Sequence, residues 1–166
     1  MSARPDRLWV IHLSKQPEVA RRACEEGFVC IGWGSVGDLG PLDSRDKALA
    51  AFCRTYSDWS INRARSCSNQ AFRFAHEIRE DDWVVFPQKG AQRYHIGRFK
   101  GGYVWSSDPR LVGADCQHTR LVTWLTEAER PEWSEQAVAS FGAASSLTNS
   151  DRHLPEVLKL LEQRPQ

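Results

Sequence analysis

Aromatic rings beside cationic side chains are the feature of this sequence that most strongly suggests chemistry. The chain has seven tryptophans in 166 residues, and Trp33, Trp59, Tyr103 and Trp105 fall at or near predicted strand ends and loops. Indole and phenol rings stack on nucleobases with about 1–3 kcal/mol per base, and arginine and lysine neutralise phosphates. The pattern predicts a nucleic-acid-binding surface that holds one unstacked or flipped base between aromatic walls.

A glycine-punctuated loop surrounds Trp33. Its sequence over residues 32–38, Gly-Trp-Gly-Ser-Val-Gly-Asp, matches neither GxxxxGK[ST] nor GxGxxG followed by a helix, so no nucleotide-binding P-loop is expected. Glycine permits tight turns and a close approach of the backbone to a ligand. We expect this loop to present the flat face of Trp33 to a ligand, and burial of Trp33 in the core is the alternative.

Signatures of catalysis and metal binding are weak. The five histidines are scattered and form no HExxH motif, and Ser14 and Cys24 lack the flanking residues of known nucleophile motifs. No metal and no cofactor is expected. An enzyme acting on a small molecule or nucleotide, with His12, His95 or His118 paired to a carboxylate, stays open as an alternative.

Composition is typical of a globular protein. Hydrophobic residues make up 41% and charged residues 26%, with a formal net charge of +1, which excludes a disordered chain and a strongly basic nucleic-acid coat. The five cysteines form no CxxC pair, so free buried thiols in a reducing cytoplasm are expected. Residues 1–13 contain no long apolar stretch, and neither a signal peptide nor a membrane span is expected.

Apolar periodicity predicts the elements that position these residues. Strands are expected over residues 8–13, 28–33, 82–86, 93–99, 102–105 and 119–125. Helices are expected over residues 18–26, from position 43 or 44 to 56, over 68–78, and in short pieces after 131. Trp9, Trp83 and Trp124 fall inside apolar strand segments and are predicted to be core residues. The order of elements predicts an α+β domain, a small open β-barrel flanked by helices.

The order of short motifs resembles a known family. The motifs are Trp9 in the first strand, Ile31-Gly-Trp-Gly34, Gly37-Asp-Leu39, Asn69-Gln70 with Phe74, Asp81-Asp-Trp-Val-Val85, Ile96-Gly97, Tyr103, and His118-Thr-Arg-Leu-Val-Thr-Trp124. Over about residues 7–148 the chain is similar to the EVE-like, PUA-superfamily domain at the N-terminus of Mrr-type modification-dependent restriction proteins, which is related to the YTH and EVE readers of modified bases. The resemblance implies a PUA-like reader domain over residues 1–148, a C-terminal helical tail over 149–166, and binding of a modified base without catalysis.

The resemblance also implies which residues contact the ligand. Trp33 matches the family's Gly-Trp-Gly turn, and the amide of Asn69 can both donate to and accept from a base edge. The predicted base pocket consists of Trp33, Asn69, Trp59, Tyr103, Trp105 and Ser14. The predicted phosphate contacts are Arg63, Arg65, Lys89 and Arg93.

The partner that the resemblance implies is DNA carrying a modified base, with RNA as the other possibility. The implied role is modification-dependent restriction or defence, and any nuclease would lie in a separate domain or partner because this chain shows no nuclease-like motif. A protein-interaction module that uses an apolar patch around Trp133 and the C-terminal helix is the second alternative.

Overall fold

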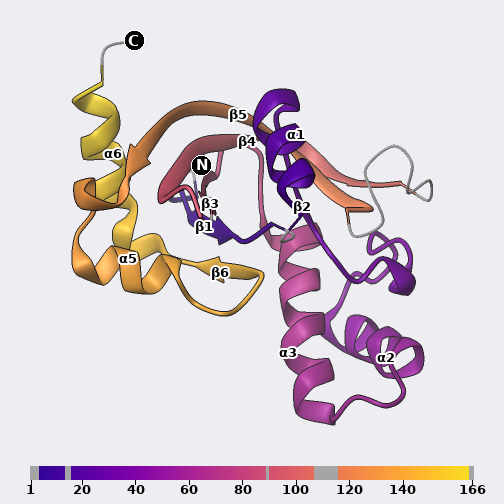
Figure 1. The fold of residues 1–166 in the computed structure, drawn as a ribbon. Coiled ribbons are helices and arrows are strands. Elements are labelled where there is room, and N and C mark those ends of the chain that lie inside the picture. Colours follow the sequence, from indigo (N-terminus) through magenta and orange to yellow (C-terminus); the bar gives the residue numbers. More distant parts are fainter. Residues whose placement is uncertain (1–3, 14–15, 89, 107–115, 165–166) are drawn as a thin grey trace.

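The chain folds into a curled six-stranded sheet flanked by helices (Figure 1). The computed structural model describes residues 4–13, 16–88, 90–106 and 116–164. The strands are β1 (Leu8–Ile11), β2 (Phe28–Ile31), β3 (Trp83–Gln88), β4 (Arg93–Trp105), β5 (His118–Glu129) and β6 (Leu147–Asn149). The α-helices are α1 (Pro17–Glu26), α2 (Arg45–Thr55), α3 (Ile61–Phe72), α5 (Glu135–Phe141) and α6 (Leu154–Glu162). Two short turns matter below, the 3-10 turn η1 (Gly34–Val36) and the π-helical turn η2 (Arg73–Glu77).

The sheet has the strand order β2-β5-β4-β3-β1-β6. Neighbouring strands are antiparallel except β1 and β3, which are parallel. The long ladder between β4 and β5 changes register at Ile96/Gly97 and at Lys100/Tyr103, and such irregularities bend a strand and increase its twist. This pair therefore curls the sheet into the half-barrel of Figure 1, and the predicted α+β fold with a small open barrel is confirmed.

The turn from α1 into β2 depends on Gly27. This residue has φ 78°, and its N–H donates to the Ala23 carbonyl to close the helix. A Cβ at this position would lie 2.8 Å from the carbonyl oxygen of Val122 on β5. Because glycine alone combines the left-handed conformation with this close approach, α1 can end and β2 can begin without an intervening loop.

The helix predicted over residues 68–78 begins earlier than expected. Its N-cap is Ser60, whose hydroxyl accepts the N–H of Arg63, and α3 runs from Ile61 to Phe72 before the π-helical turn η2. Its first two turns bury only Ala64, so this part of the helix has no apolar stripe that periodicity could detect. The position of the cap, rather than an apolar face, determines where the helix starts.

The π-helical turn η2 ends against a buried arginine of β5. Arg120 Nε donates to the Phe74 carbonyl at 2.6 Å, and Nη2 donates to the Ala75 carbonyl at 3.1 Å. Burial lowers the pKa of Arg120 to about 10, so the guanidinium remains charged at neutral pH. A cation at the carbonyl end of a helix is favoured by the helix dipole, and this contact joins the α3 region to the sheet.

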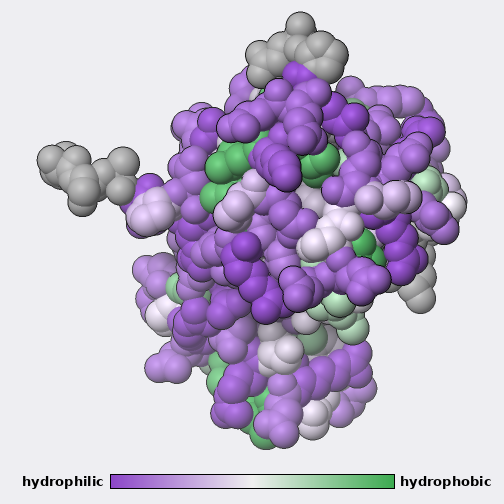
Figure 2. Space-filling view, turned by 90° about the vertical axis from the view of Figure 1, so that its left-hand side faces the viewer, coloured by the Kyte–Doolittle hydropathy of each residue, from purple (hydrophilic) through white to green (hydrophobic). Residues whose placement is uncertain are grey.

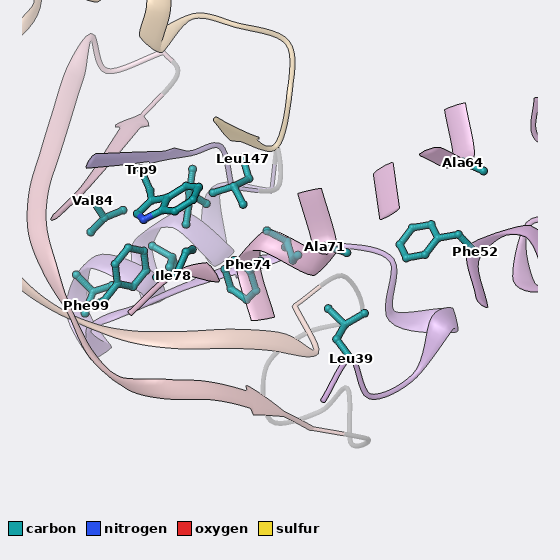
Figure 3. Close-up of a cluster of buried hydrophobic side chains, with 14 residues drawn as sticks. Trp9, Leu39, Phe52, Ala64, Ala71, Phe74, Ile78, Val84, Phe99 and Leu147 are labelled. Carbon is teal, nitrogen blue, oxygen red and sulfur yellow. The ribbon is translucent and has the colours of Figure 1, made fainter. Parts of the chain in front are cut away.

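The main core lies between the concave side of the sheet and the helices (Figure 3). Trp9 is fully buried, and its indole N–H donates to the buried carboxylate of Asp82 at 3.0 Å. Phe52 extends the same core into the lobe formed by α2 and α3. The predictions that Trp9 and Trp83 are core residues are confirmed, with 0% and 7% exposure, whereas Trp124 is only partly buried.

A second core lies under the C-terminal helices. Val157 and Leu160 of α6 pack in one cluster with Val10 of β1 and Phe141 of α5. β6 joins the sheet by pairing with β1 over residues 147–149. The division of the chain at residue 148 into a reader domain and a tail remains a prediction. Among the described residues, no helix has the length and apolar character that a membrane span requires.

The expectation that all five cysteines are free is wrong. Cys30 of β2 and Cys116, two residues before β5, form a disulfide bond across a sequence separation of 86. Cys24, Cys53 and Cys67 are free. The spacing along the sequence gave no sign of this pair, because the antiparallel pairing of β2 with β5 is what brings the two residues together.

Candidate nucleic-acid interface

A chain of hydrogen bonds centred on His118 joins three segments at one end of the sheet. His118 is fully buried, its Nε2 lies 3.0 Å from the Trp33 carbonyl, and its Nδ1 lies 2.8 Å from the Tyr103 hydroxyl. A carbonyl only accepts, so Nε2 carries the proton and Nδ1 accepts from Tyr103. The Tyr103 oxygen in turn accepts the N–H of Leu39 at 3.1 Å. Each of these atoms is thereby satisfied, which fixes the neutral tautomer of the imidazole.

The pKa shifts of His118 and Tyr103 agree with the hydrogen bonds that these two side chains form. Burial lowers the pKa of His118, although the Trp33 carbonyl and the nearby Asp38 oppose this effect. Burial also raises the pKa of Tyr103, and Asp38 adds to this shift. At neutral pH the imidazole and the phenol are therefore both uncharged, and the carboxylate of Asp38 lies near them.

Trp33 directly follows β2 and Gly32, and its backbone is unusual. Its φ of 66° and ψ of 36° are left-handed, a conformation that costs a residue other than glycine roughly 1–2 kcal/mol. The indole is half-buried and packs edge-on against Phe52, with ring centroids 5.8 Å apart. Strained residues of this kind cluster at ligand-binding sites, and here the strain positions a large ring that remains partly accessible.

Trp105 completes an aromatic group around His118. Its ring lies 4.9 Å from that of His118 at the end of β4 and is half-buried. Tyr103 lies 5.9 Å from the same imidazole. Two of the predicted base-pocket residues, Tyr103 and Trp105, therefore place their rings beside His118, whereas Trp33, about 70 residues earlier in the sequence, contacts it through its backbone carbonyl and turns its indole to Phe52.

Asn69 lies on α3 and does not contact this aromatic group. Its Oδ1 accepts from Arg45 Nη1 at 3.1 Å, and the same guanidinium pairs with Glu77 and lies 5.2 Å from the Phe72 ring. Because Arg45 uses the amide oxygen, the amide nitrogen keeps two hydrogens for another acceptor. The amide nitrogen, which has no competing contact of this kind among the described residues, is therefore the group of Asn69 best placed to serve a base edge.

Trp59 belongs to a neighbouring aromatic group. Its ring stacks on Tyr56 at 4.1 Å, and both rings contact Phe52, which also packs against Trp33. Trp59 therefore lies one aromatic ring away from Trp33. Ser14 falls outside the described residues.

The predicted phosphate contacts fall at two different places. Arg63 and Arg65 are exposed on the first turns of α3. Arg93 is at the opposite end of β4 from Tyr103, where it pairs with Glu127 at 3.5 Å. Lys89 falls outside the described residues.

Two residues that organise the site were not predicted to belong to it. The sequence indicates His118 only as a candidate catalytic residue, and it does not single out Asp38 as a site residue. Both occur in the motifs Gly37-Asp-Leu39 and His118-Thr-Arg that carry the family resemblance. A buried histidine with two fixed partners could not have been distinguished from an active-site histidine by spacing alone.

The geometry at His95 does not support the alternative of a histidine-based enzyme. His95 Nε2 lies 3.6 Å from the Cys24 sulfur and 2.8 Å from Gln88 Oε1. Burial raises the pKa of the Cys24 thiol, with Glu127 and Glu25 adding to the effect, and burial lowers the pKa of His95. A thiolate–imidazolium pair is therefore disfavoured, which is the opposite of what an activated cysteine requires.

A serine–histidine–glutamate cluster occurs elsewhere, between α5 and α6. Ser140 Oγ lies 3.0 Å from His153 Nε2, whose Nδ1 lies 3.1 Å from Glu156 Oε2. Arg152 also donates to both Ser140 Oγ and His153 Nε2, so the atom that would accept the serine proton is already engaged. Ser140 lies near the carboxyl end of α5, where the helix dipole disfavours a developing oxyanion. We assign this cluster a structural role in holding α5 against α6.

The alternative of a protein-interaction patch around Trp133 and the C-terminal helix is not supported at Trp133, whereas Leu158 of α6 is exposed and lines one pocket with Leu125 of β5. Trp133 is 6% exposed and packs edge-on against Phe141. On the face that Figure 2 shows, hydrophobic residues form small patches separated by hydrophilic ones. Among the described residues, no group of three or more His, Cys, Asp or Glu side chains could hold a metal ion.

Comparison with known proteins supports the fold. A family model described as a domain of unknown function, DUF8426, matches residues 9–148. The YTH domain of the Zygosaccharomyces rouxii MRB1 protein, solved in complex with N6-methyladenosine RNA, gives a TM-score of 0.52 at 10% sequence identity and covers 97% of this chain and 90% of that one.

Two structures of the mmi1 YTH domain, one of them an RNA complex, are also similar. The complex has a TM-score of 0.48 at 7% identity and covers 95% of this chain and 80% of its own. The other has a TM-score of 0.49 at 9% identity and covers 96% of this chain and 100% of its own. No curated protein matches the sequence. The prediction of a YTH-like fold is confirmed by the MRB1 domain, and the Mrr-type context stays a prediction.

Proposed function

We propose that this chain, which belongs to the DUF8426 family and has the YTH fold, binds nucleic acid by holding one modified base against Trp33 and Trp105. The observation that carries the proposal is the meeting of three segments at His118, where the Tyr103 and Trp105 rings lie beside the imidazole and the Trp33 carbonyl accepts its N–H. Two half-buried indoles in segments joined by an uncharged hydrogen-bonded pair, His118 and Tyr103, suit a planar, uncharged ligand. A nucleobase that has left its stack is such a ligand.

Selectivity for a modified base follows from the same geometry. One added methyl group contributes only about 0.8 kcal/mol when it is buried, so the preference depends on close contact with the indole faces and on hydrogen bonds to the base edge. Tyr103 and His118 use their polar atoms on each other, whereas the Asn69 amide keeps its donors. Trp33 and Trp105 would then supply stacking, and Asn69 would supply the directional contact.

The proposal also specifies the kind of nucleic acid and the kind of modified base. The sequence resemblance favours DNA and a role in modification-dependent restriction, with a nuclease as a fused or separate partner. The MRB1 YTH domain is in complex with N6-methyladenosine RNA. The modified base is common to both, so we propose an N-methylated base as the ligand, and we propose binding without catalysis in this chain.

The test is a binding titration with matched oligonucleotides. Single-stranded DNA and RNA of one sequence, with and without one N6-methyladenine, are titrated while tryptophan fluorescence is followed. The wild-type protein should prefer a methylated strand by about fourfold or more, since one buried methyl group contributes about 0.8 kcal/mol. Trp33→Ala and Asn69→Ala should lose this preference, and Trp33→Phe should retain part of it.

A matched control separates loss of the site from loss of the fold. Tyr94 is also half-buried and lies at the other end of β4, so Tyr94→Ala should keep the preference of whatever fraction remains folded. Thermal unfolding of each variant establishes that fraction. Equal affinity of the wild-type protein for methylated and unmethylated strands, in both DNA and RNA, would exclude an N-methyladenine reader.

A further inference from the structure

Three side chains form a continuous stack where α2 meets α3. The Trp59 ring lies 4.1 Å from the Tyr56 ring at an interplanar angle of 9°, and the Arg63 guanidinium carbon lies 4.0 Å from the centroid of the same indole. Two groups at this distance cannot share one face of a ring, so Tyr56 and Arg63 cover opposite faces of Trp59. The indole is thus sandwiched, and Arg63 is the outermost layer of the stack.

Arg63 has no carboxylate partner in the part of the chain that the structure describes. The same is true of Arg54 and Arg65, and all three are exposed. Asp58, the carboxylate of the connecting turn, forms no ion pair there either. Positive charge is therefore concentrated at this corner although the whole chain has a formal net charge of only +1. A guanidinium stacked on an indole is restrained in orientation and keeps its N–H donors directed outward.

The stack and the base site share one framework. Phe52 is fully buried and contacts Trp33 at 5.8 Å, Tyr56 at 5.6 Å and Trp59 at 6.4 Å between ring centroids. Burial raises the pKa of Tyr56, and the nearby side chain of Ser35, two residues after Trp33, opposes this shift. Phe52 and Trp59 are therefore the two rings that connect Trp33 to Arg63, so the base site and this cation belong to one aromatic framework.

We propose that Arg63 binds the phosphate adjacent to the modified nucleotide, so that the nucleic-acid strand runs from the Trp33 turn across the α2–α3 corner. Trp59 and Tyr56 are positioning residues that hold the guanidinium flat, and Arg54 and Arg65 extend the cationic track. The inference rests on the proposed function, because it takes the ligand to be a strand whose modified base occupies the Trp33 site.

This path of the nucleic-acid strand gives Trp59 a role that does not require contact with the base. Both of its faces are already covered, so its contribution is to restrain Arg63 rather than to touch the base. It also assigns different roles to the predicted phosphate contacts. Arg63 and Arg65 lie on the route, whereas Arg93 lies at the far end of β4 and is paired with Glu127.

The test measures affinity against salt concentration for the methylated and unmethylated strands. Arg63→Ala should weaken binding of both strands by the same factor, about tenfold, which corresponds to one charge-assisted hydrogen bond. It should also reduce the slope of log affinity against log salt by about 0.7, the value for one phosphate of a single strand. The preference for the methylated strand should not change, because Arg63 does not contact the base.

Two further variants separate charge from positioning. Arg63→Lys keeps the charge but lacks the planar fork that stacks on the indole, so the slope should stay near that of the wild type while affinity falls by a smaller factor. Trp59→Ala should weaken both strands alike, and its folded fraction is checked by circular dichroism. Lys159→Ala on α6, on the opposite side of the molecule from α2 and α3 (Figure 1), removes one exposed charge and should change neither affinity nor slope.

The outcomes distinguish this inference from the proposed function. If the wild-type protein prefers the methylated strand and Arg63→Ala matches its affinity and slope, the route across the α2–α3 corner is wrong. If Arg63→Ala abolishes the preference for the methylated strand, Arg63 belongs to the base pocket and the inference is overturned. If the wild-type protein binds both strands equally while Arg63→Ala still loses affinity and slope, the modified-base proposal fails and the phosphate site stands.

Discussion

Tyr103 is the residue on which the arrangement of the aromatic site depends. Its hydroxyl accepts from the Leu39 N–H and donates to His118 Nδ1, so one oxygen links the loop after Trp33 to β5. Removing it leaves a buried imidazole nitrogen and a backbone N–H without partners, and each unsatisfied buried group costs about 1–3 kcal/mol. The residue therefore influences the position of the Trp33 turn without having to touch a ligand.

We predict that Tyr103→Phe lowers the free energy of unfolding by about 2–6 kcal/mol, because two buried groups lose their partner, and weakens the preference for a methylated strand. Urea unfolding and the fluorescence titration measure the two effects. Tyr94→Phe is the matched control, because Tyr94 is also half-buried on β4 and its hydroxyl has no hydrogen-bond partner among the described residues. Equal unfolding midpoints for the two phenylalanine variants would show that the hydrogen-bond chain does not stabilise the fold.

The disulfide between β2 and the start of β5 is the element-scale feature closest to this site. Cys30 lies three residues before Trp33, and Cys116 lies two residues before His118. The bond therefore joins the two segments whose hydrogen bond, from His118 Nε2 to the Trp33 carbonyl, forms one side of the site. A crosslink over a separation of 86 residues restricts the unfolded chain and stabilises the folded one by about 2–4 kcal/mol.

We predict that the denatured, unreduced protein exposes three reactive thiols, those of Cys24, Cys53 and Cys67, and that reduction raises this number to five. Thiol titration in denaturant measures both values. Replacing Cys30 and Cys116 together with serine should lower the free energy of unfolding by about 2–4 kcal/mol, while Cys53→Ser serves as the control with a half-buried free thiol. Five reactive thiols before reduction would disprove the crosslink.

The elements show which features could be predicted from the sequence. β1, β2 and the start of α2 follow from local patterns, since apolar runs and the Ser44 cap are contiguous in the sequence. The first half of α3 and the short strand β6 do not, because α3 buries few side chains there and β6 is defined only by its pairing with β1. A local sequence pattern predicts an element when the residues of that element make its stabilising contacts themselves.

The same distinction applies to the site. Trp33 could be identified because its glycine neighbours mark a tight turn, and Tyr103 and Trp105 could be grouped with it only through motif order. The role of His118 depends on the Trp33 carbonyl, 85 residues away, and the Cys30–Cys116 bond depends on strand register. Contacts of this kind are determined by the packing of distant segments, and no spacing rule within one segment reveals them.

At the scale of the whole molecule, near-neutral charge limits non-specific binding. A formal net charge of +1 gives weak long-range attraction for a polyanion, so selectivity for the proposed nucleic-acid ligand has to come from the aromatic site and from the few cations near it.

Two buried histidines affect the stability of the whole molecule. Burial lowers the pKa of both His118 and His95, and both sit at sheet positions that link the sheet to another segment.

These two histidines make the stability of the whole protein depend on pH. The unfolded chain binds protons at its histidines near pH 6.5, whereas the folded chain resists this until the pH is lower, so between these values the unfolded state binds more protons. Stability therefore falls as the pH decreases from 6.5 through the lowered folded-state pKa values, and it is fully present above 6.5. The carboxylates with lowered pKa values, such as Glu156, act only at more acidic pH because their ordinary value is 4.5.

We predict that the free energy of unfolding decreases between pH 7.5 and pH 5.5, and that this decrease largely disappears when His118 and His95 are both replaced with glutamine. Urea unfolding at closely spaced pH values measures the slope, which is independent of any constant loss caused by the substitutions themselves. His118→Gln alone should remove part of the slope, and so should His95→Gln. A wild-type stability that stays constant or increases over this range would mean that neither imidazole is held neutral by the fold, and the fixed tautomer at the aromatic site would have to be abandoned with it.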